Sequence, residues 1–230
     1  MKEQVVSTKI LEESMEQFRL LFLHDTDLVA ASARKHGIIV TQGSILEPPT
    51  ENTYSLRIPT GTPQEVKALM GTQRVVLSCM DYRQAYAVAQ TAKADVVIAT
   101  AGGAAQPEES RRRATVKLLK TIREVNPDAV LVLTAHDHVC GGVNHFSNDE
   151  MKKTYNESGP FVEKMMMKDH LRTLARDLRA SGVRLTNIAV AIAHIDDRNQ
   201  FAGLESLPLA DSLGIFPRFP SRKHPRTQKA

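Results

Sequence analysis

Between residues 74 and 195 the chain alternates short apolar runs with longer amphipathic segments, and this alternation limits the fold more than any other feature. The apolar runs predict four buried strands, at 74–78, 95–100, 129–135 and 186–195. Apolar residues at helical spacing predict the intervening helices, at about 84–92, 107–125 and 160–181. Strands that alternate with helices form a parallel sheet covered on both faces. The sequence therefore predicts an α/β fold with a mostly parallel β-sheet flanked by helices.

The segment before this alternation has a different pattern. Leu11, Met15, Phe18 and Phe22 recur at helical spacing, and a second helix is expected after a cap near Asp25. Glycines and prolines then predict loops with short extended pieces up to about residue 62. We therefore divide the chain into three parts: an N-terminal helical arm and loop at 1–62, an α/β domain at 63–215, and a basic tail at 216–230 that we predict to be disordered.

Composition limits the class of protein. The chain is 42% apolar and 24% charged, which is typical of a soluble globular protein. The net charge of +4 comes largely from the tail and from Arg111, Arg112 and Arg113, and few aromatic residues lie nearby to stack on bases, so we expect no nucleic-acid partner. The N-terminus lacks the apolar core of a signal peptide, and no window approaches the roughly 18 consecutive apolar residues of a membrane span. The expected location is the cytoplasm, where cysteines stay reduced.

The only two cysteines, Cys79 and Cys140, each follow a predicted strand. Ligand sites of open α/β sheets form beyond the carboxyl ends of the strands, so these two thiols can converge with His136. Two thiolates and an imidazole are a zinc ligand set, and three protein ligands leave a fourth position open for water or substrate. The sequence thus indicates a catalytic zinc site. The alternative is a pair of unrelated buried thiols.

Polar residues beside Cys79 suit the same interpretation. The pattern Cys-x-Asp-x-Arg places Asp81 two residues and Arg83 four residues after the cysteine. A carboxylate at that spacing can reach the metal or its bound water, and an arginine can hold it through a forked, charge-assisted pair. The alternative makes Asp81 a helix cap and Arg83 a surface cation.

The two cysteine motifs together resemble those of the β-class carbonic anhydrases. That family has Cys-x-Asp-x-Arg at one strand end and His-x-x-Cys, usually followed by Gly, two strands later. The resemblance spans about residues 74–201 and includes the turn Ala101-Gly102-Gly103. The run 190–197 is similar to the family's final core strand, which leads into an acidic turn.

The resemblance implies a β-carbonic anhydrase-like fold and a Zn²⁺ cofactor. The implied activity is reversible hydration of carbon dioxide to bicarbonate and a proton by zinc-bound hydroxide, which Asp81 would orient while Arg83 keeps Asp81 ionised and off the metal. Gly102, Gly103 and Gly141 would line the substrate-binding site. The implied assembly is a homodimer or higher homo-oligomer in which the N-terminal arm packs on a partner subunit.

The chain departs from the family pattern at the metal. The residue three before Cys140 is Asp137, with His136 and His138 on either side. Keeping the strand in register assigns the ligand position to His136, with a loop one residue longer, while Asp137 and His138 remain alternatives because zinc accepts both oxygen and nitrogen donors. The Arg-Asn that often precedes the Ala-Gly turn in the family is also missing.

Two other functions follow from these departures. One is hydrolysis of carbon disulfide or carbonyl sulfide at the same site. The other is a zinc-binding family member without hydration activity, in which Asp81 or Asp137 closes the fourth position. His145 and His194 are candidate proton shuttles, or a loop histidine and a strand-end histidine that are hydrogen-bonded in place.

Overall fold

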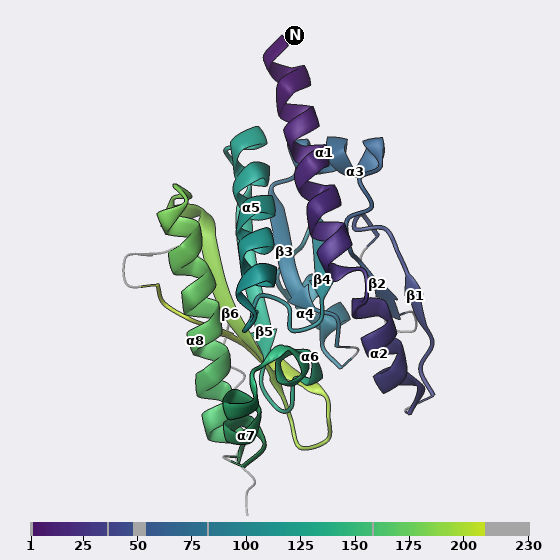
Figure 1. Cartoon of the computed structure of the whole chain (residues 1–230), viewed down its shortest axis with the longest axis vertical. Helices are drawn as coiled ribbons and strands as arrows, with labels where there is room; N and C mark the ends of the chain where they lie inside the picture. Colours follow the sequence, from purple (N-terminus) through teal and green to yellow (C-terminus); the bar gives the residue numbers. More distant parts are fainter. Residues whose placement is uncertain (1, 36, 48–53, 82, 158, 210–230) are drawn as a thin grey trace, which may run out of the picture.

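The computed structural model describes residues 2–35, 37–47, 54–81, 83–157 and 159–209. Its centre is a five-stranded sheet with strand order β4-β3-β5-β6-β7 (Figure 1). The strands are β3 (Arg74–Cys79), β4 (Val96–Thr100), β5 (Val130–His136), β6 (Ile188–Ile195) and β7 (Phe201–Ser206). The first four are mutually parallel, and β7 runs antiparallel to β6. The predicted α/β fold with a mostly parallel sheet is confirmed, but the expected four strands are corrected to five.

Helices cover both faces of the sheet. Neighbouring strand residues point to opposite sides, so each strand contributes apolar side chains to a core on either face. Leu77, Leu133 and Val190 belong to the large core with α5 (Glu109–Val125) and α8 (Gly159–Ala180). Val76 and Val132 belong to a smaller core on the other face, with Val88 of α4 (Ala85–Thr91). Figure 1 shows α5 and α8 side by side on one face. These helices and the four parallel strands lie where the sequence pattern predicts them.

The strand connections reverse direction at one place in the sheet. From β3 the chain crosses to β4 on one side, and from β5 it crosses to β6 on the other side. The connections that leave neighbouring strands β3 and β5 therefore run in opposite directions. In open α/β sheets, ligands bind at such a reversal, beyond the carboxyl ends of the strands. Cys79 ends β3 and His136 ends β5, so both lie at this point.

The N-terminal segment packs on the same chain. Helix α1 (Lys2–Phe22) lies along α5, and its residues Leu11 and Phe18 are buried in the large core (Figure 1). Helix α2 (Asp25–Arg34), the short parallel pair β1 (Val40–Gln42) and β2 (Tyr54–Leu56), and α3 (Pro63–Gly71) complete the segment. The amide nitrogens of Val97 and Ala99 donate to the carbonyls of Ile45 and Arg57. The outer edge of β4 is therefore covered, which protects it from pairing with another chain.

A buried ion pair joins this arm to the domain. Arg111 of α5 makes two parallel hydrogen bonds of 2.8 Å to the Asp25 carboxylate. The guanidinium also lies between two aromatic rings, 3.9 Å from the centre of Phe22 and 3.7 Å from that of Phe146. Asp25 in turn accepts a bond of 2.7 Å from the amide of Ala101. The arm thus contacts the turn that follows β4.

The remaining described segments are short. Helices α6 (Gly141–Phe146) and α7 (Asp149–Glu157) follow β5, and a 3-10 turn at Leu185–Asn187 precedes β6. No helix among the described residues combines the length and apolar character that crossing a membrane requires. The basic tail predicted at 216–230 lies outside the described residues.

Candidate metal centre

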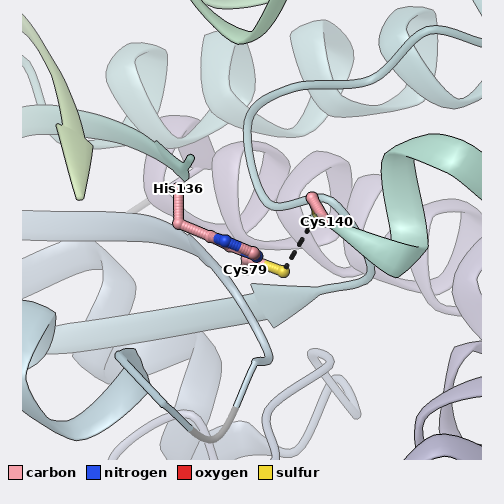
Figure 2. Close-up of side chains that lie close together, drawn as sticks. All are labelled: Cys79, His136 and Cys140. Atoms are coloured by element: carbon pink, nitrogen blue, oxygen red, sulfur yellow. Dashed lines mark hydrogen bonds between the residues drawn. The ribbon is translucent and has the colours of Figure 1, made fainter. Parts of the chain in front are cut away.

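The side chains of Cys79, His136 and Cys140 converge into one buried group. Their ligand atoms all lie within 4.8 Å of one another. Figure 2 shows that Cys79 comes from the end of β3, His136 from the end of β5, and Cys140 from the loop just before α6. Cys79 is 4% exposed, and His136 and Cys140 are fully buried. The group could hold a metal ion, as the sequence predicts from the positions of these residues at or after the ends of two strands.

The distance between the sulfurs fits metal coordination and not a disulfide. Cys79 Sγ and Cys140 Sγ are 3.9 Å apart, and both cysteines are free. A disulfide would hold the two atoms at about 2.05 Å. Two sulfurs bound to one tetrahedral zinc ion at about 2.3 Å lie about 3.8 Å apart. The two thiols are therefore spaced as a pair of zinc ligands.

The orientation of the His136 imidazole also suits metal coordination. Its Nδ1 lies 2.7 Å from the backbone oxygen of Asp137, and because a carbonyl only accepts, Nδ1 carries the hydrogen. Among the described residues, none hydrogen-bonds the buried Nε2. A backbone acceptor on one ring nitrogen is the usual way in which a protein fixes a metal-binding histidine. Nε2 is thus the available ligand atom.

Protonation equilibria couple the three side chains. The hydrogen bond with Cys140, and then burial, raise the pKa of Cys79 well above its usual value. Burial lowers the pKa of His136, but the neighbouring Cys79 and Asp81 outweigh it and raise this pKa to about 9. A metal ion must displace these protons in order to bind. Metal binding is therefore expected to weaken as the pH falls.

Asp81 lies beside the group and is held by Arg83. Two parallel bonds join them, from Arg83 Nε to Oδ1 at 2.9 Å and from Nη2 to Oδ2 at 2.7 Å. Asp81 Oδ2 is 3.6 Å from His136 Nε2. Burial raises the pKa of Asp81, but the Arg83 bonds and the nearby His136 outweigh it and lower this pKa. An ionised Asp81 carboxylate therefore lies beside the Cys79–His136–Cys140 group, and Arg83 donates hydrogen bonds to both of its oxygens.

The two alternative ligands point elsewhere. The Asp137 carboxylate lies 2.5 Å from Nδ1 of His194 and accepts from the amide of Ile195 at 2.9 Å. The second ring nitrogen of His194 is 2.9 Å from Glu205 Oε2. His138 is half-buried and lies outside the group of three. Of the three candidates at 136–138, the structure brings only His136 to the two cysteines.

Two of the three predicted glycines, Gly102 and Gly103, lie in the buried turn after β4. A Cβ atom on Gly103 would approach the backbone nitrogen of Cys79 to 2.3 Å, and one on Gly142 would approach the nitrogen of Gly102 to 2.4 Å. Gly102 and Gly103 also have left-handed backbones, with φ of +86° and +58°. These close approaches pack the turn after β4 against both cysteine segments. Gly141, by contrast, is exposed and has open space around it.

Three further residues that the sequence pattern did not predict support the site. Gly142 makes the close approach just described. Gln84, 1% exposed, donates from Nε2 to the carbonyl of Cys79 at 2.8 Å. Glu163 of α8, 4% exposed, accepts from the amide of Cys140 at 3.2 Å. Glu163 could have been recognised as a charged residue on the apolar face of a predicted helix. A buried carboxylate needs a hydrogen-bond or ionic partner, so such a residue indicates a polar contact in the core.

Comparison of the chain with protein-family models, with curated proteins and with solved structures gives no match. No family is assigned to the chain on this basis. The resemblance to β-class carbonic anhydrases therefore rests on the two cysteine motifs of the sequence.

Proposed function

We propose that this chain is a zinc-dependent enzyme of the β-carbonic anhydrase type, which hydrates carbon dioxide reversibly to bicarbonate and a proton. The observation that carries the proposal is the buried Cys79–His136–Cys140 group beside an Asp81 carboxylate that Arg83 holds. Two thiols and an imidazole are a preferred donor set for zinc, and the sulfur spacing fits that ion. A zinc ion held by these residues would supply water that ionises near neutral pH, the nucleophile of the hydration reaction.

The surrounding carboxylates support a site with an open fourth position. Asp137 is engaged by His194 and Ile195, and Asp81 is engaged by Arg83. Neither is therefore free to close the site as a fourth ligand. Three protein ligands and an accessible fourth position distinguish a catalytic zinc site from a structural one. This arrangement favours an enzyme over a binding module.

Asp81 has a specific role in the proposed reaction. Its lowered pKa keeps it ionised, so it acts only as a hydrogen-bond acceptor. Accepting a bond from the attacking water or hydroxide orients the oxygen lone pair toward the substrate. Arg83 keeps the carboxylate in this position. The near-complete burial of the three candidate ligands suits a substrate as small as carbon dioxide.

Stopped-flow measurement of carbon dioxide hydration by the zinc-loaded protein tests the proposal. We expect kcat/KM to rise with pH between about 7 and 9, as the water ionises. Asp81→Ala should keep stoichiometric zinc and lose turnover by about 100-fold or more, in the range of a lost acid–base or orienting group. Asp128→Ala removes an exposed carboxylate in the turn just before β5 and should leave both zinc content and turnover unchanged.

Two results would overturn the proposal. A protein purified without chelator that holds no stoichiometric zinc would remove the metal site. A fully zinc-loaded protein without hydration above the uncatalysed rate would remove the activity. Assays with carbon disulfide and carbonyl sulfide would then separate a changed substrate from a site without hydrolytic activity.

A further inference from the structure

We propose that Arg83 is a positioning residue for the candidate metal ligand Cys140, because it holds the strained loop that presents this thiol to Cys79 and His136. This role is additional to its bonds with Asp81. It rests on the proposed metal site, but not on whether the protein hydrates carbon dioxide. The backbone between His136 and Cys140 needs such a support.

That backbone contains two consecutive residues in the left-handed conformation. His138 has φ of +61° and Val139 has φ of +57°. Residues other than glycine rarely adopt positive φ, and for a β-branched residue such as valine it is a clear outlier. The side chain of Val139 is 58% exposed, so burial of this side chain does little to hold the loop. Other interactions must therefore offset the conformational cost.

Arg83 supplies those interactions through the loop carbonyls. Its Nη1 donates to the backbone oxygen of His138 at 3.1 Å, and its Nη2 donates to that of Val139 at 3.0 Å. The carbonyls of both left-handed residues thus bind one guanidinium. A planar, permanently charged fork can bind two adjacent carbonyls in this way, whereas a lysine ammonium cannot reproduce its fixed geometry.

The remaining donors of Arg83 fix the guanidinium itself. Nε and Nη2 bind Asp81, and Nη1 also donates to Asn199 Oδ1 at 3.2 Å. These contacts engage all five N–H groups of an arginine side chain. The side chain is 11% exposed. Arg83 is therefore a rigid support, anchored on the β3–α4 turn and on the β6–β7 hairpin.

The loop leads directly to the metal ligand. At the end of the loop, the backbone amide of Cys140 donates a hydrogen bond to the Glu163 carboxylate. On the near side, Asp137 is fixed to β6 by Ile195. The segment between these two anchors consists of His138 and Val139, which Arg83 holds. Without Arg83 this segment can relax to ordinary φ values, and the Cys140 thiol is then held less firmly beside its partners.

The test measures zinc affinity by competition with a chromophoric chelator, in the wild-type protein and in Arg83→Ala, Asp81→Ala and the double variant. Loss of an outer partner of a metal ligand lowers affinity by about 10- to 100-fold. We expect that loss in Arg83→Ala, and also when Arg83→Ala is made in the Asp81→Ala background. Asp81→Ala alone should stay within about threefold of wild type. Arg83→Lys should lose affinity as Arg83→Ala does.

Val139→Gly provides a rescue that a merely structural role would not give. Glycine adopts positive φ without steric cost, so the loop can keep its shape without the guanidinium. Adding Val139→Gly to Arg83→Ala should recover at least about half of the lost affinity on a logarithmic scale, and in Co²⁺-loaded protein it should restore the thiolate charge-transfer absorption.

Unchanged or tighter zinc binding when Arg83→Ala is made in the Asp81→Ala background would overturn the inference, because no Asp81 carboxylate is then present to replace a loss at Cys140. The same conclusion follows if Val139→Gly gives no rescue. An absence of hydration activity, by contrast, would count against the proposed function alone, since these affinities do not depend on turnover.

Discussion

At the scale of single residues, His136 is distinguished from its neighbours by its burial and by its place beside the two cysteines. It is fully buried with Nδ1 bound to a backbone oxygen, whereas the His138 side chain is half-buried and outside the metal group. We expect His136→Ala to lower zinc affinity by more than about 100-fold, beyond the usual effect of an outer partner. The matched control is His138→Ala, which removes the same side chain two positions away and should keep the metal.

Zinc content after dialysis, and chelator competition, measure this difference. Asp137→Ala should have an intermediate effect, because it removes the anchor to β6 but no ligand. The opposite order, with His138→Ala or Asp137→Ala emptying the site and His136→Ala leaving it full, would contradict the assignment.

The sequence could predict the convergence of the cysteines, but not the geometry of the segment between the ligands. Cys79 and His136 end neighbouring parallel strands, so the topology alone brings them together. The choice among residues 136–138 depended on strand register. The loop shape depends on positive φ at His138 and Val139, and a β-branched valine gives no signal of such a conformation. The bonds from Arg83 to these carbonyls were therefore not predictable from local sequence.

At the scale of elements, α8 and β7 are joined by a charged network around Glu205. Lys164 and Lys168 of α8 lie 2.7 and 2.6 Å from its two oxygens, and His194 lies 2.9 Å away. Partial burial raises the pKa of Glu205, but the hydrogen bonds from the two lysines outweigh it and lower this pKa from 4.5 to about 2. The charged form is thus favoured in the folded protein.

This shift predicts a pH-dependent contribution to stability. Because the folded pKa is depressed, the contribution is fully present above about pH 4.5 and is lost as the pH falls toward 2. Glu205 is 35% exposed, so solvent screening limits the effect to about 1 kcal/mol. Glu205→Gln should lower the thermal unfolding temperature at pH 7, and this difference should shrink between pH 4.5 and 2.

Glu12→Gln, at an exposed position of α1, is the matched control and should change little at either pH. A difference between wild type and Glu205→Gln that stays constant across the acid range would show that the charge of Glu205 is not responsible.

Strand β7 shows the limit of pattern analysis for elements. The four parallel strands are near-continuous apolar runs, which buried strands require and which are easily recognised. Residues 201–206 read Phe-Ala-Gly-Leu-Glu-Ser, and are only partly apolar because β7 lies at the sheet edge. Their strand structure comes from pairing with β6, a tertiary contact that overrides a weak local preference. The acidic turn before them was predicted, and Asp196 Oδ1 there accepts from the amides of Arg198 and Gln200.

At the scale of the whole molecule, the Asp25–Arg111 pair connects the arm with the sheet domain. The two side chains are 1% and 4% exposed. Removing one partner leaves the other charge buried, which costs about 3–5 kcal/mol. We expect Arg111→Ala to lower the free energy of unfolding in urea by that amount. Arg113→Ala, which breaks an exposed pair with Glu109 on the same helix, should change it by less than about 1 kcal/mol.

Equal effects of the two substitutions would show that the buried pair does not tie the arm to the domain. The prediction that the arm also packs on a partner subunit stays a prediction. The outer surface of α1 and the residue that follows it is consistent with such packing, because Ile10, Leu20 and Leu23 are each more than 40% exposed.

The separation of Cys79 and Cys140 in the chain has a consequence for the order in which the molecule assembles. The two thiols are 61 positions apart, and β4, α5 and β5 are formed by the residues between them. Closing a loop of this length has a large entropic cost, so the two sulfurs meet only after that intervening structure has docked. An ion bound by the proposed site would therefore enter late, after the sheet has formed. Release of that ion would then require this structure to reopen, so its rate would depend on more than the strength of any one ligand.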